Sequence, residues 1–430
     1  MNKKLIIYFY IVTGLFSQQI DTVWIRGYDS PEMTADYGSS ITIDNTGTNV
    51  YVAGSSGKKR LLIKYSSNGD LKWVKYEPAV YSDEGDPIGL TYWNGKIYFT
   101  VSMTYQNIYY DKQIWTFCYD TSGSKLWGQN FGDMYDCDFP VNLFIDKQGY
   151  LYVAGTSCFD TTAEDFILLK YDSNNGNMIW YKRYWSVYDY VLDMALDATI
   201  SYDSNYIYIG GISEKPNEYR EYRIVKYSTA GSLIFSVSRP IQDPYNSTLK
   251  IFPDYSDNLY ALFINYSIGQ YESSSVSKYN PNGNLIYQIV LPESLKVNSI
   301  FVDSENNFYI IGSVFNYNNN TWDAFLRKYS SQGTMLFEKT FDLGMNEENL
   351  IIKSFNNSLL ILCKSDPGVF FLRYSYDGIL LNTSNFFLSQ YKIEDFVKSQ
   401  LNNNVYSIGT VPPNDYEWPS DIVLVKYEVP

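Results

Sequence analysis

The stretch Asp165–Trp180 reads DFILLKYDSNNGNMIW, an alternating run followed by a glycine turn and a second short run. Its Lys-Tyr pair returns along the whole chain, with Cys118 and Arg373 as the variants of the lysine. The tyrosines of the pair are Tyr65, Tyr119, Tyr171, Tyr227, Tyr279, Tyr329, Tyr374 and Tyr427. Successive pairs are separated by roughly 52 residues, a period that predicts a propeller or a repeat array.

Each repeat contains the sequence of four short strands. In the first repeat, two β-branched and aromatic runs flank a turn at Asp44–Gly47, which predicts a hairpin. Residues 61–76 hold two further runs around Ser66–Gly69. Four antiparallel strands per repeat are typical of a propeller blade.

The repeats place the same chemistry at matching positions. Asp or Asn is expected to open the first turn, at Asp44, Asn94, Asp146, Asp197, Asp254, Asp303, Asn356 and Asn403. Glycine closes the last turn, where a positive φ is expected, at Gly69, Gly123, Gly176, Gly231, Gly283, Gly333 and Gly378. An aromatic residue stands four residues later, at Trp73, Trp127, Trp180, Phe235, Tyr287 and Phe337, and is expected to pack between blades. Asn382 takes this place in the seventh repeat, so that blade is expected to be the weakest.

The two ends of the chain complement each other. The eighth repeat ends at Lys426-Tyr427 without a fourth strand, whereas residues 22–28 form a fourth strand with no blade before it. Trp24 supplies the missing aromatic residue. The sequence therefore predicts an all-β fold, an eight-bladed propeller of four-stranded antiparallel blades, in which strand 22–28 completes the last blade and removes the free sheet edges.

The N-terminus has the pattern of a secretory signal, with lysines at positions 3 and 4 before an apolar run from Leu5 to Phe16. We expect residues 1–17 to be a signal peptide and residues 18–430 to form a single propeller domain. The protein is then secreted, to the extracellular space or the periplasm. The apolar run is too short to span a bilayer, so no membrane insertion is expected.

Charge and composition exclude several classes of function. The formal net charge is −14, which would repel nucleic acid. The chain has no histidine, which excludes Ser-His-Asp and Cys-His nucleophile systems and removes the commonest zinc ligand. We expect no cofactor, no structural metal site and a monomer, and an enzyme is disfavoured.

A second polar series stands eight residues before the predicted first-turn residues. It comprises Asp36, Asp86, Asp138, Asp189, Asn246, Glu348 and Asp395, with the apolar Leu295 at the remaining place. In a propeller these positions lie where the innermost strand begins. That end belongs to the top face, which carries the connections from fourth to first strand and from second to third strand. One interpretation is a ring at the channel mouth that attracts cations or accepts sugar hydroxyls. The alternative is that each side chain caps backbone amides between blades.

Three further predictions concern the loops and the repeated lysines. Top-face loops carry tyrosine, tryptophan and acidic residues that suit glycan or protein ligands, including Tyr135, Tyr188 and Trp418. Cys137 and Cys158 both fall on that face, so a disulfide between them is a candidate. The Lys-Tyr lysines are expected to pair with the first-turn carboxylates of their own or a neighbouring blade.

The whole pattern resembles the secreted bacterial and archaeal β-propeller-repeat family over essentially the full chain. The features in common are Ile43-Asp44, Gly47 and Tyr51-Val52-Ala53-Gly54, followed by Lys64-Tyr65, Gly69 and Trp73. That resemblance implies secretion and a propeller without an assigned activity. The family is usually described as seven-bladed, whereas this chain carries eight repeats.

Three functions remain in competition. The preferred one is a secreted, non-enzymatic binding or scaffold propeller with a glycan, cation or protein ligand at the top face. The alternative is an enzyme that acts on polysaccharide through paired carboxylates at the channel mouth. A third follows from a distant similarity of Lys170-Tyr171, Gly176 and Trp180 to the docking repeat of quinoprotein-like propellers, although the chain has no adjacent cysteine pair.

Overall fold

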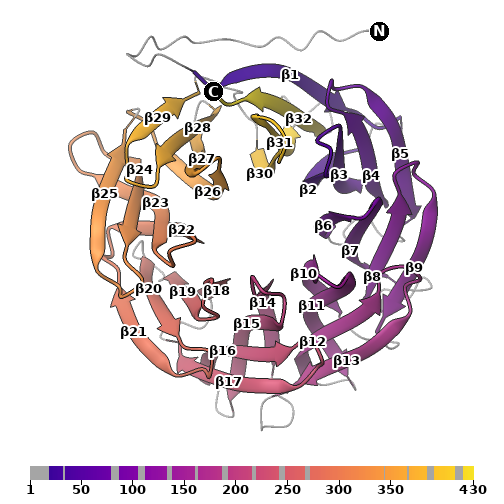
Figure 1. The fold of residues 1–430 in the computed structure, drawn as a ribbon, viewed down its shortest axis with the longest axis horizontal. Coiled ribbons are helices and arrows are strands. Elements are labelled where there is room, and N and C mark those ends of the chain that lie inside the picture. The colour runs from indigo at the N-terminus through magenta and orange to yellow at the C-terminus, as the bar shows by residue number, and fades with distance from the viewer. Residues whose placement is uncertain are drawn as a thin grey trace.

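The computed structural model describes residues 19–31, 34–78, 87–104, 112–132, 138–159, 163–185, 192–215, 219–241, 247–266, 272–342, 344–365, 368–384, 392–411 and 420–430. They form eight four-stranded sheets, and every neighbouring pair of strands within a sheet is antiparallel. The sheets stand as blades around a central opening, so the predicted eight-bladed β-propeller is confirmed (Figure 1).

In the first four blades the chain runs from the innermost strand outward. Blade 1 holds β2 (Asp36–Ile43), β3 (Asn49–Ser56), β4 (Lys59–Ser66) and β5 (Leu71–Pro78). Blade 2 holds β6 (Ile88–Trp93), β7 (Lys96–Thr104), β8 (Lys112–Asp120) and β9 (Lys125–Phe131). Blade 3 holds β10 (Phe139–Ile145), β11 (Tyr150–Phe159), β12 (Ala163–Asp172) and β13 (Met178–Tyr184). Blade 4 holds β14 (Asp193–Ile200), β15 (Tyr206–Lys215), β16 (Tyr219–Ser228) and β17 (Leu233–Pro240).

The last four blades follow the same plan. Blade 5 holds β18 (Ser247–Pro253), β19 (Leu259–Tyr266), β20 (Glu272–Tyr279) and β21 (Leu285–Val290). Blade 6 holds β22 (Leu295–Val302), β23 (Phe308–Asn316), β24 (Thr321–Tyr329) and β25 (Met335–Phe341). Blade 7 holds β26 (Glu347–Phe355), β27 (Ser358–Ser365), β28 (Gly368–Ser375) and the short β29 (Leu380–Thr383). Blade 8 holds β30 (Lys392–Lys398), β31 (Asn404–Val411), β32 (Asp421–Glu428) and, outermost, β1 (Asp21–Tyr28).

The predicted ring closure is confirmed by the pairing of β1 with β32. The register runs from Asp21 opposite Glu428 to Tyr28 opposite Ile422. Figure 1 shows the indigo β1 beside the yellow β32 at the rim. Trp24 Nε1 donates to the carbonyl of Ser67 in blade 1 at 3.2 Å, so the closing strand also ties the last blade to the first.

The hydrophobic core lies between the blades. Eight buried clusters each combine apolar side chains from two neighbouring blades. The repeated second-strand tyrosines belong to these clusters and are completely buried: Tyr51, Tyr98, Tyr152, Tyr208, Tyr260, Tyr309 and Tyr406. Because each blade has two large apolar faces, it is stabilised only with a neighbour on both sides, which the closed ring provides.

The first turn has a different register from the predicted one in three blades, of which blades 4 and 8 share a cause. In blade 4 the backbone N–H that closes the turn belongs to Ser201, which donates to Tyr206, while Asp197 lies inside β14. In blade 8 the closing residue is Ser399, which donates to Asn404. Serine replaces aspartate at both places and fills the same role with its hydroxyl, which concealed the register in the sequence.

The part of the chain that the structure describes contains no helix with the length and apolarity needed to cross a membrane.

Candidate binding site at the channel mouth

Two described members of the predicted acidic series begin innermost strands, and their side chains are buried. Asp36 and Asp138 stand at or directly before the starts of β2 and β10, and both are completely buried. Asp36 Oδ2 accepts the backbone N–H of Ser30 at 2.7 Å. Burial raises the pKa of Asp36, and hydrogen bonds from Ser56 and Ser30 oppose that rise. The amide-capping interpretation therefore describes Asp36, whereas a binding role of the series at the channel mouth stays a prediction.

The corrected turn register changes two members of the series. In blade 4 the residue equivalent to Asp36 is Asp193, eight before Ser201, instead of Asp189. In blade 7 it is Glu347 instead of Glu348, because Phe355 takes the place that Asp44 has in blade 1. Asp193 and Glu347 are completely buried, as are Asp36 and Asp138. The acids thus form a buried repeat at the junctions between blades.

Asp395 has a different position from the one predicted. It lies within β30 in the channel wall, where its Oδ1 accepts from Lys353 Nζ at 2.6 Å and from its own neighbour, the N–H of Phe396, at 2.7 Å. Lys353 belongs to blade 7, so the pair joins two blades. The Asp395 carboxylate is neutralised there by a cation.

Several predicted positions lie outside the described residues, so their roles stay predictions. These are Asp86, Asp189, Asn246, Tyr135, Tyr188 and Trp418, together with the side chain of Glu348. The same holds for Cys137, and hence for the disulfide with Cys158. Cys118 and Cys363 are buried in strands, and burial raises the pKa of both thiols, which makes them unreactive.

The Lys-Tyr lysines tie six of the eight blades to the next blade. Six of them donate to a backbone carbonyl in the last turn of the following blade, at 2.8 to 3.2 Å: Lys64, Lys170, Lys226, Lys278, Lys328 and Lys426. The predicted carboxylate partners are present only for some, as in Lys278 with Asp254 at 3.1 Å and Lys226 with Asp257 at 2.6 Å. The prediction named a secondary partner, since the common acceptor is a main-chain oxygen.

Two groups of carboxylates converge at blade junctions on the top face. Candidate ligand oxygens of Asp29, Asp36 and Asp421 lie within 4.8 Å of one another, and so do those of Asp323, Asp342 and Glu347. Each group joins the third strand of one blade to the start of the next blade. Asp323 Oδ2 accepts from Asn316 Nδ2 at 2.7 Å, so hydrogen bonds within the protein satisfy part of the second group.

The wall of the channel is held by hydrogen bonds between innermost strands. Asn142 Nδ2 donates to Ala198 O at 2.8 Å, and the Asp197 carboxylate accepts the N–H of Ile251 at 2.9 Å. Lys250 Nζ donates to Asn298 O at 2.8 Å. These bonds run from blade 3 to blade 6 and make the lining a continuous surface.

The mouth of the channel on the top face carries apolar residues in blades 1, 3 and 4 and lysines in blades 6 and 8, with Glu348 at the corresponding position of blade 7. In three blades the residue that directly follows the buried acid is apolar and exposed. The exposed fraction of its side chain is 46% for Tyr37, 38% for Phe139 and 41% for Met194. These belong to blades 1, 3 and 4. In blades 6 and 8 the corresponding residues are Lys296 and Lys392. These three side chains therefore offer apolar area to a ligand at the starts of three innermost strands.

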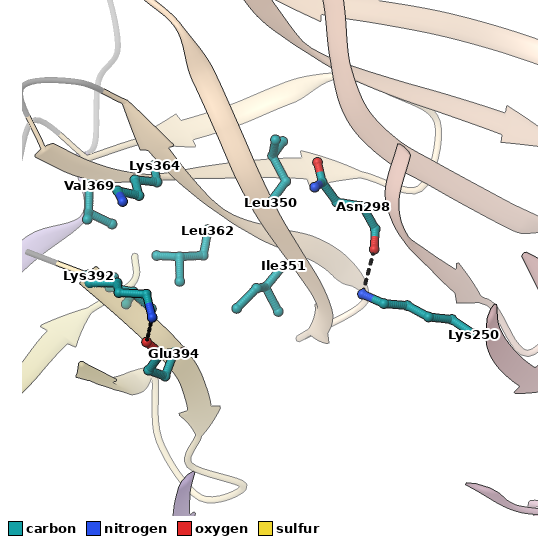
Figure 2. Close-up of a pocket in the computed structure, with 10 residues that line it drawn as sticks. Lys250, Asn298, Leu350, Ile351, Leu362, Lys364, Val369, Lys392 and Glu394 are labelled. Carbon is teal, nitrogen blue, oxygen red and sulfur yellow. Dashed lines mark hydrogen bonds and ion pairs between the residues drawn. The ribbon is translucent and has the colours of Figure 1, made fainter. Parts of the chain in front are cut away.

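A pocket opens on the side of the channel that blades 5 to 8 form, with a cavity volume of about 260 Å³. Three lysines and one glutamate surround it: Lys250 of β18, Lys364 of β27, and Lys392 and Glu394 of β30. Figure 2 shows Lys364 and Lys392 on one side and Lys250 on the opposite side, with apolar side chains between them. That apolar floor consists of Leu350, Ile351, Leu362, Val369 and Ile393.

The charge of the described pocket lining is opposite in sign to the net charge of the whole chain. Lys392 Nζ lies 2.8 Å from Glu394 Oε1. Desolvation lowers the pKa of Lys250, and Asp197 opposes this shift. Among the side chains that the structure describes, none makes a hydrogen bond or ion pair with the Lys364 ammonium, and the residue opposite Lys364 in the pairing of β26 with β27 is Glu348. Three ammonium groups against one carboxylate give the described lining a positive charge, although the chain carries −14.

Sequence reasoning missed both features. The exposed rim residues follow the acidic series by one position, and period-two alternation along a strand could have found them. The pocket left no such signal, because its lysines occupy unrelated positions of three blades.

No protein-family model and no curated protein sequence matches the chain. Among solved structures, the chain is similar to a europium-containing methanol dehydrogenase, with 10% sequence identity, a TM-score of 0.57, and coverage of 96% of this chain and 95% of that chain. It is also similar to the Dos1 propeller, with 10% identity, a TM-score of 0.59 and 95% coverage of both chains. At this level of identity the likeness shows the propeller fold alone.

Proposed function

We propose that the protein is a secreted, non-enzymatic binding propeller whose ligand contacts the channel mouth on the top face. The observation that carries this proposal is the exposed rim of Tyr37, Phe139 and Met194 beside the lysine pocket. The repeated polar residues, by contrast, have contacts within or between blades, such as Lys170 with Thr229 O.

A glycan is the ligand that this rim suits best, because an aromatic ring offers apolar area with little loss of conformational freedom. The test is a panel of defined oligosaccharides on an array, repeated with a Tyr37→Ala, Phe139→Ala double variant. We expect saturable binding that the double variant loses and Lys72→Met retains. Saturable binding that survives the double variant would contradict the rim as the site, and capture of proteins only would make the ligand a protein.

The second candidate, an enzyme acting on polysaccharide, draws on the converging carboxylates Asp29, Asp36 and Asp421. Two acids in one cleft are the minimum that glycoside hydrolysis requires. Product release from the same panel, abolished by Asp29→Asn, would favour the enzyme over the binding propeller.

Export is tested separately from binding. The signal pattern predicts that the secreted chain begins near Gln18. N-terminal sequencing of protein from the culture medium or periplasm should show this end, and retention of Met1 in the cell fraction would contradict export.

A further inference from the structure

We infer that the lysine pocket binds a small organic dianion that has a carboxylate at each end and an apolar body between them. The inference rests on the proposed binding role of the channel and names the chemical class of a ligand for it. It concerns the pocket alone and does not require the aromatic rim.

The first argument is charge. The described lining holds Lys250, Lys364 and Lys392 against Glu394, inside a protein with 47 acidic and 33 basic side chains. A local excess of positive charge in such a background would be avoided unless it had a counter-ion. Lys392 has Glu394 as a partner at 2.8 Å and Lys250 has the Asp197 carboxylate nearby, so the excess of positive charge in the described lining lies mainly on Lys364.

The second argument is the arrangement of the cations. Lys250 comes from β18 and Lys364 from β27, and Figure 2 shows them on opposite sides of the pocket. A single anion cannot contact both ends equally, whereas a ligand charged at both ends can. Lys250 Nζ is already oriented by its hydrogen bond to Asn298 O at 2.8 Å, which leaves two of its donors for a ligand.

The third argument is the floor. Leu350, Ile351 and Leu362 separate the two cationic ends. Apolar side chains offer no hydrogen bonds to the hydroxyls of a sugar, so the middle of the ligand should be hydrocarbon. A cavity of about 150 Å³ is known to hold benzene, so the volume of about 260 Å³ admits a chain or ring somewhat larger than that.

The test is isothermal titration calorimetry of the purified protein, residues 18–430, with α,ω-dicarboxylates from succinate to sebacate. Heptanoate, heptanediol and diaminoheptane serve as matched ligands with one, no and opposite charge, and glucuronate serves as an acid with a polar body. We expect the best dicarboxylate to bind more tightly than heptanoate, with no detectable binding of the diol or the diamine. Binding of the diol or the diamine as tight as that of the diacid would overturn the charge argument.

Variants locate the site. Lys364→Met should weaken dicarboxylate binding roughly tenfold, the effect of one hydrogen bond to a charged group. Lys250→Met should also weaken dicarboxylate binding roughly tenfold. The two variants test the two ends of the pocket separately, so one remains informative should the other fold poorly. Lys72→Met makes the same change of net charge on the exposed outer strand and should leave affinity unchanged. Affinity that is unaffected by both pocket variants would overturn the assignment.

Two outcomes separate this inference from the proposed function. If no dicarboxylate binds while the Tyr37-dependent glycan binding persists, the pocket assignment is wrong and the binding propeller stands. If dicarboxylates bind in a Lys364-dependent manner while no ligand of the rim is found, the pocket stands and the rim proposal fails. Glucuronate binding as tight as that of the best diacid would contradict the inference that the middle of the ligand is hydrocarbon.

Discussion

At the scale of single residues, Lys170 illustrates what a repeated cation does in this ring. Its ammonium donates to Thr229 O of blade 4 at 2.9 Å and lies 4.1 Å from the centre of the Tyr150 ring. Burial lowers the pKa of Lys170, and Asp146 opposes this shift. The contact therefore offsets a desolvation cost, and its net contribution to stability is smaller than its geometry suggests.

Lys170→Met should lower the free energy of unfolding by about 1–2 kcal/mol, because the hydrogen bond and the cation–π contacts are lost while the apolar stem is kept. Chemical denaturation measures this change. Lys72→Met, whose partner Asp70 is exposed, should leave the free energy of unfolding essentially unchanged. If the two variants are equally stable, the hydrogen bond between Lys170 and Thr229 O makes no net contribution to the free energy of unfolding.

Asp197 should give the stability a specific dependence on pH. Burial raises the pKa of Asp197 to about 6, against the N–H groups of Ile251 and Ala198 that stabilise its charged form. Because the folded pKa exceeds the unfolded value of about 3.9, the protonated form stabilises the fold below about pH 4. That contribution is lost as the pH rises through about 6.

Asp197→Asn should remove this dependence. Relative to the parent, the variant should gain on the order of 1–2 kcal/mol of stability between pH 4 and pH 7. Urea denaturation of both proteins at the two pH values gives the comparison, which cancels the titration of all other carboxylates. A difference between the two proteins that is the same at both pH values would show that Asp197 titrates normally.

The acidic series shows why residue roles were only partly predictable. The pattern located Asp36 and Asp138 at the right strand ends, yet it could not show that they are buried, because an aspartate can cap amides or face solvent. The prediction took Asp197 as the turn residue, and eight residues before it stands Asp189. In the structure the turn begins at Ser201, and eight residues before Ser201 stands Asp193. A serine and an aspartate are interchangeable at such turns, so sequence alone does not fix the register there.

At the scale of elements, the last turn of each of the first seven blades carries a glycine against an aromatic ring of the preceding blade. Gly176 has a φ of +76°, and an added Cβ would lie 2.7 Å from Trp127. Trp127 Nε1 also donates to Ser173 O in the same turn at 3.1 Å. The turn and the ring therefore form one inter-blade contact.

Gly176→Ala should lower the free energy of unfolding by about 2–4 kcal/mol, since it combines a strained φ with a clash against a rigid ring. Gly95→Ala is the matched control, because Gly95 has a φ of +78° and no atom lies within 4 Å of its added Cβ. The control should cost only about 1 kcal/mol. Equal losses in the two variants would mean that the ring moves freely aside.

Elements were the easiest level to predict, and the reason is repetition. Eight copies of one turn and strand pattern average out local ambiguity, so the strands around Lys170 and Gly176 were found correctly. The pocket has no such support: Lys250, Lys364 and Lys392 come from an innermost strand, a second strand and the start of another innermost strand. Their convergence depends on the curvature of the ring, which no single repeat encodes.

At the scale of the whole molecule, the ring is closed by strand pairing between the two ends of the sequence. β1 contributes backbone bonds to β32, and Trp24 and Arg26 reach carbonyls of Ser67 and Gly69 in blade 1 at 3.2 and 2.8 Å. Without β1, the outer edge of β32 would be exposed and the interface of blades 8 and 1 would lose its outer contacts. Closure thus stabilises every blade, because each depends on two neighbours.

Deletion of residues 18–30 should therefore lower the unfolding temperature by about 10 °C, the effect of losing several kcal/mol from a domain of this size. Differential scanning calorimetry gives the midpoint, and size-exclusion chromatography should show association through the exposed edge of β32. Deletion of residues 2–17 alone should leave the midpoint unchanged, since that segment matches a signal sequence. Trp24→Ala should give an intermediate loss, because it keeps the strand pairing and removes only the ring and its bond to Ser67. An unchanged midpoint after the larger deletion would show that seven complete blades and an open eighth are as stable as the closed ring.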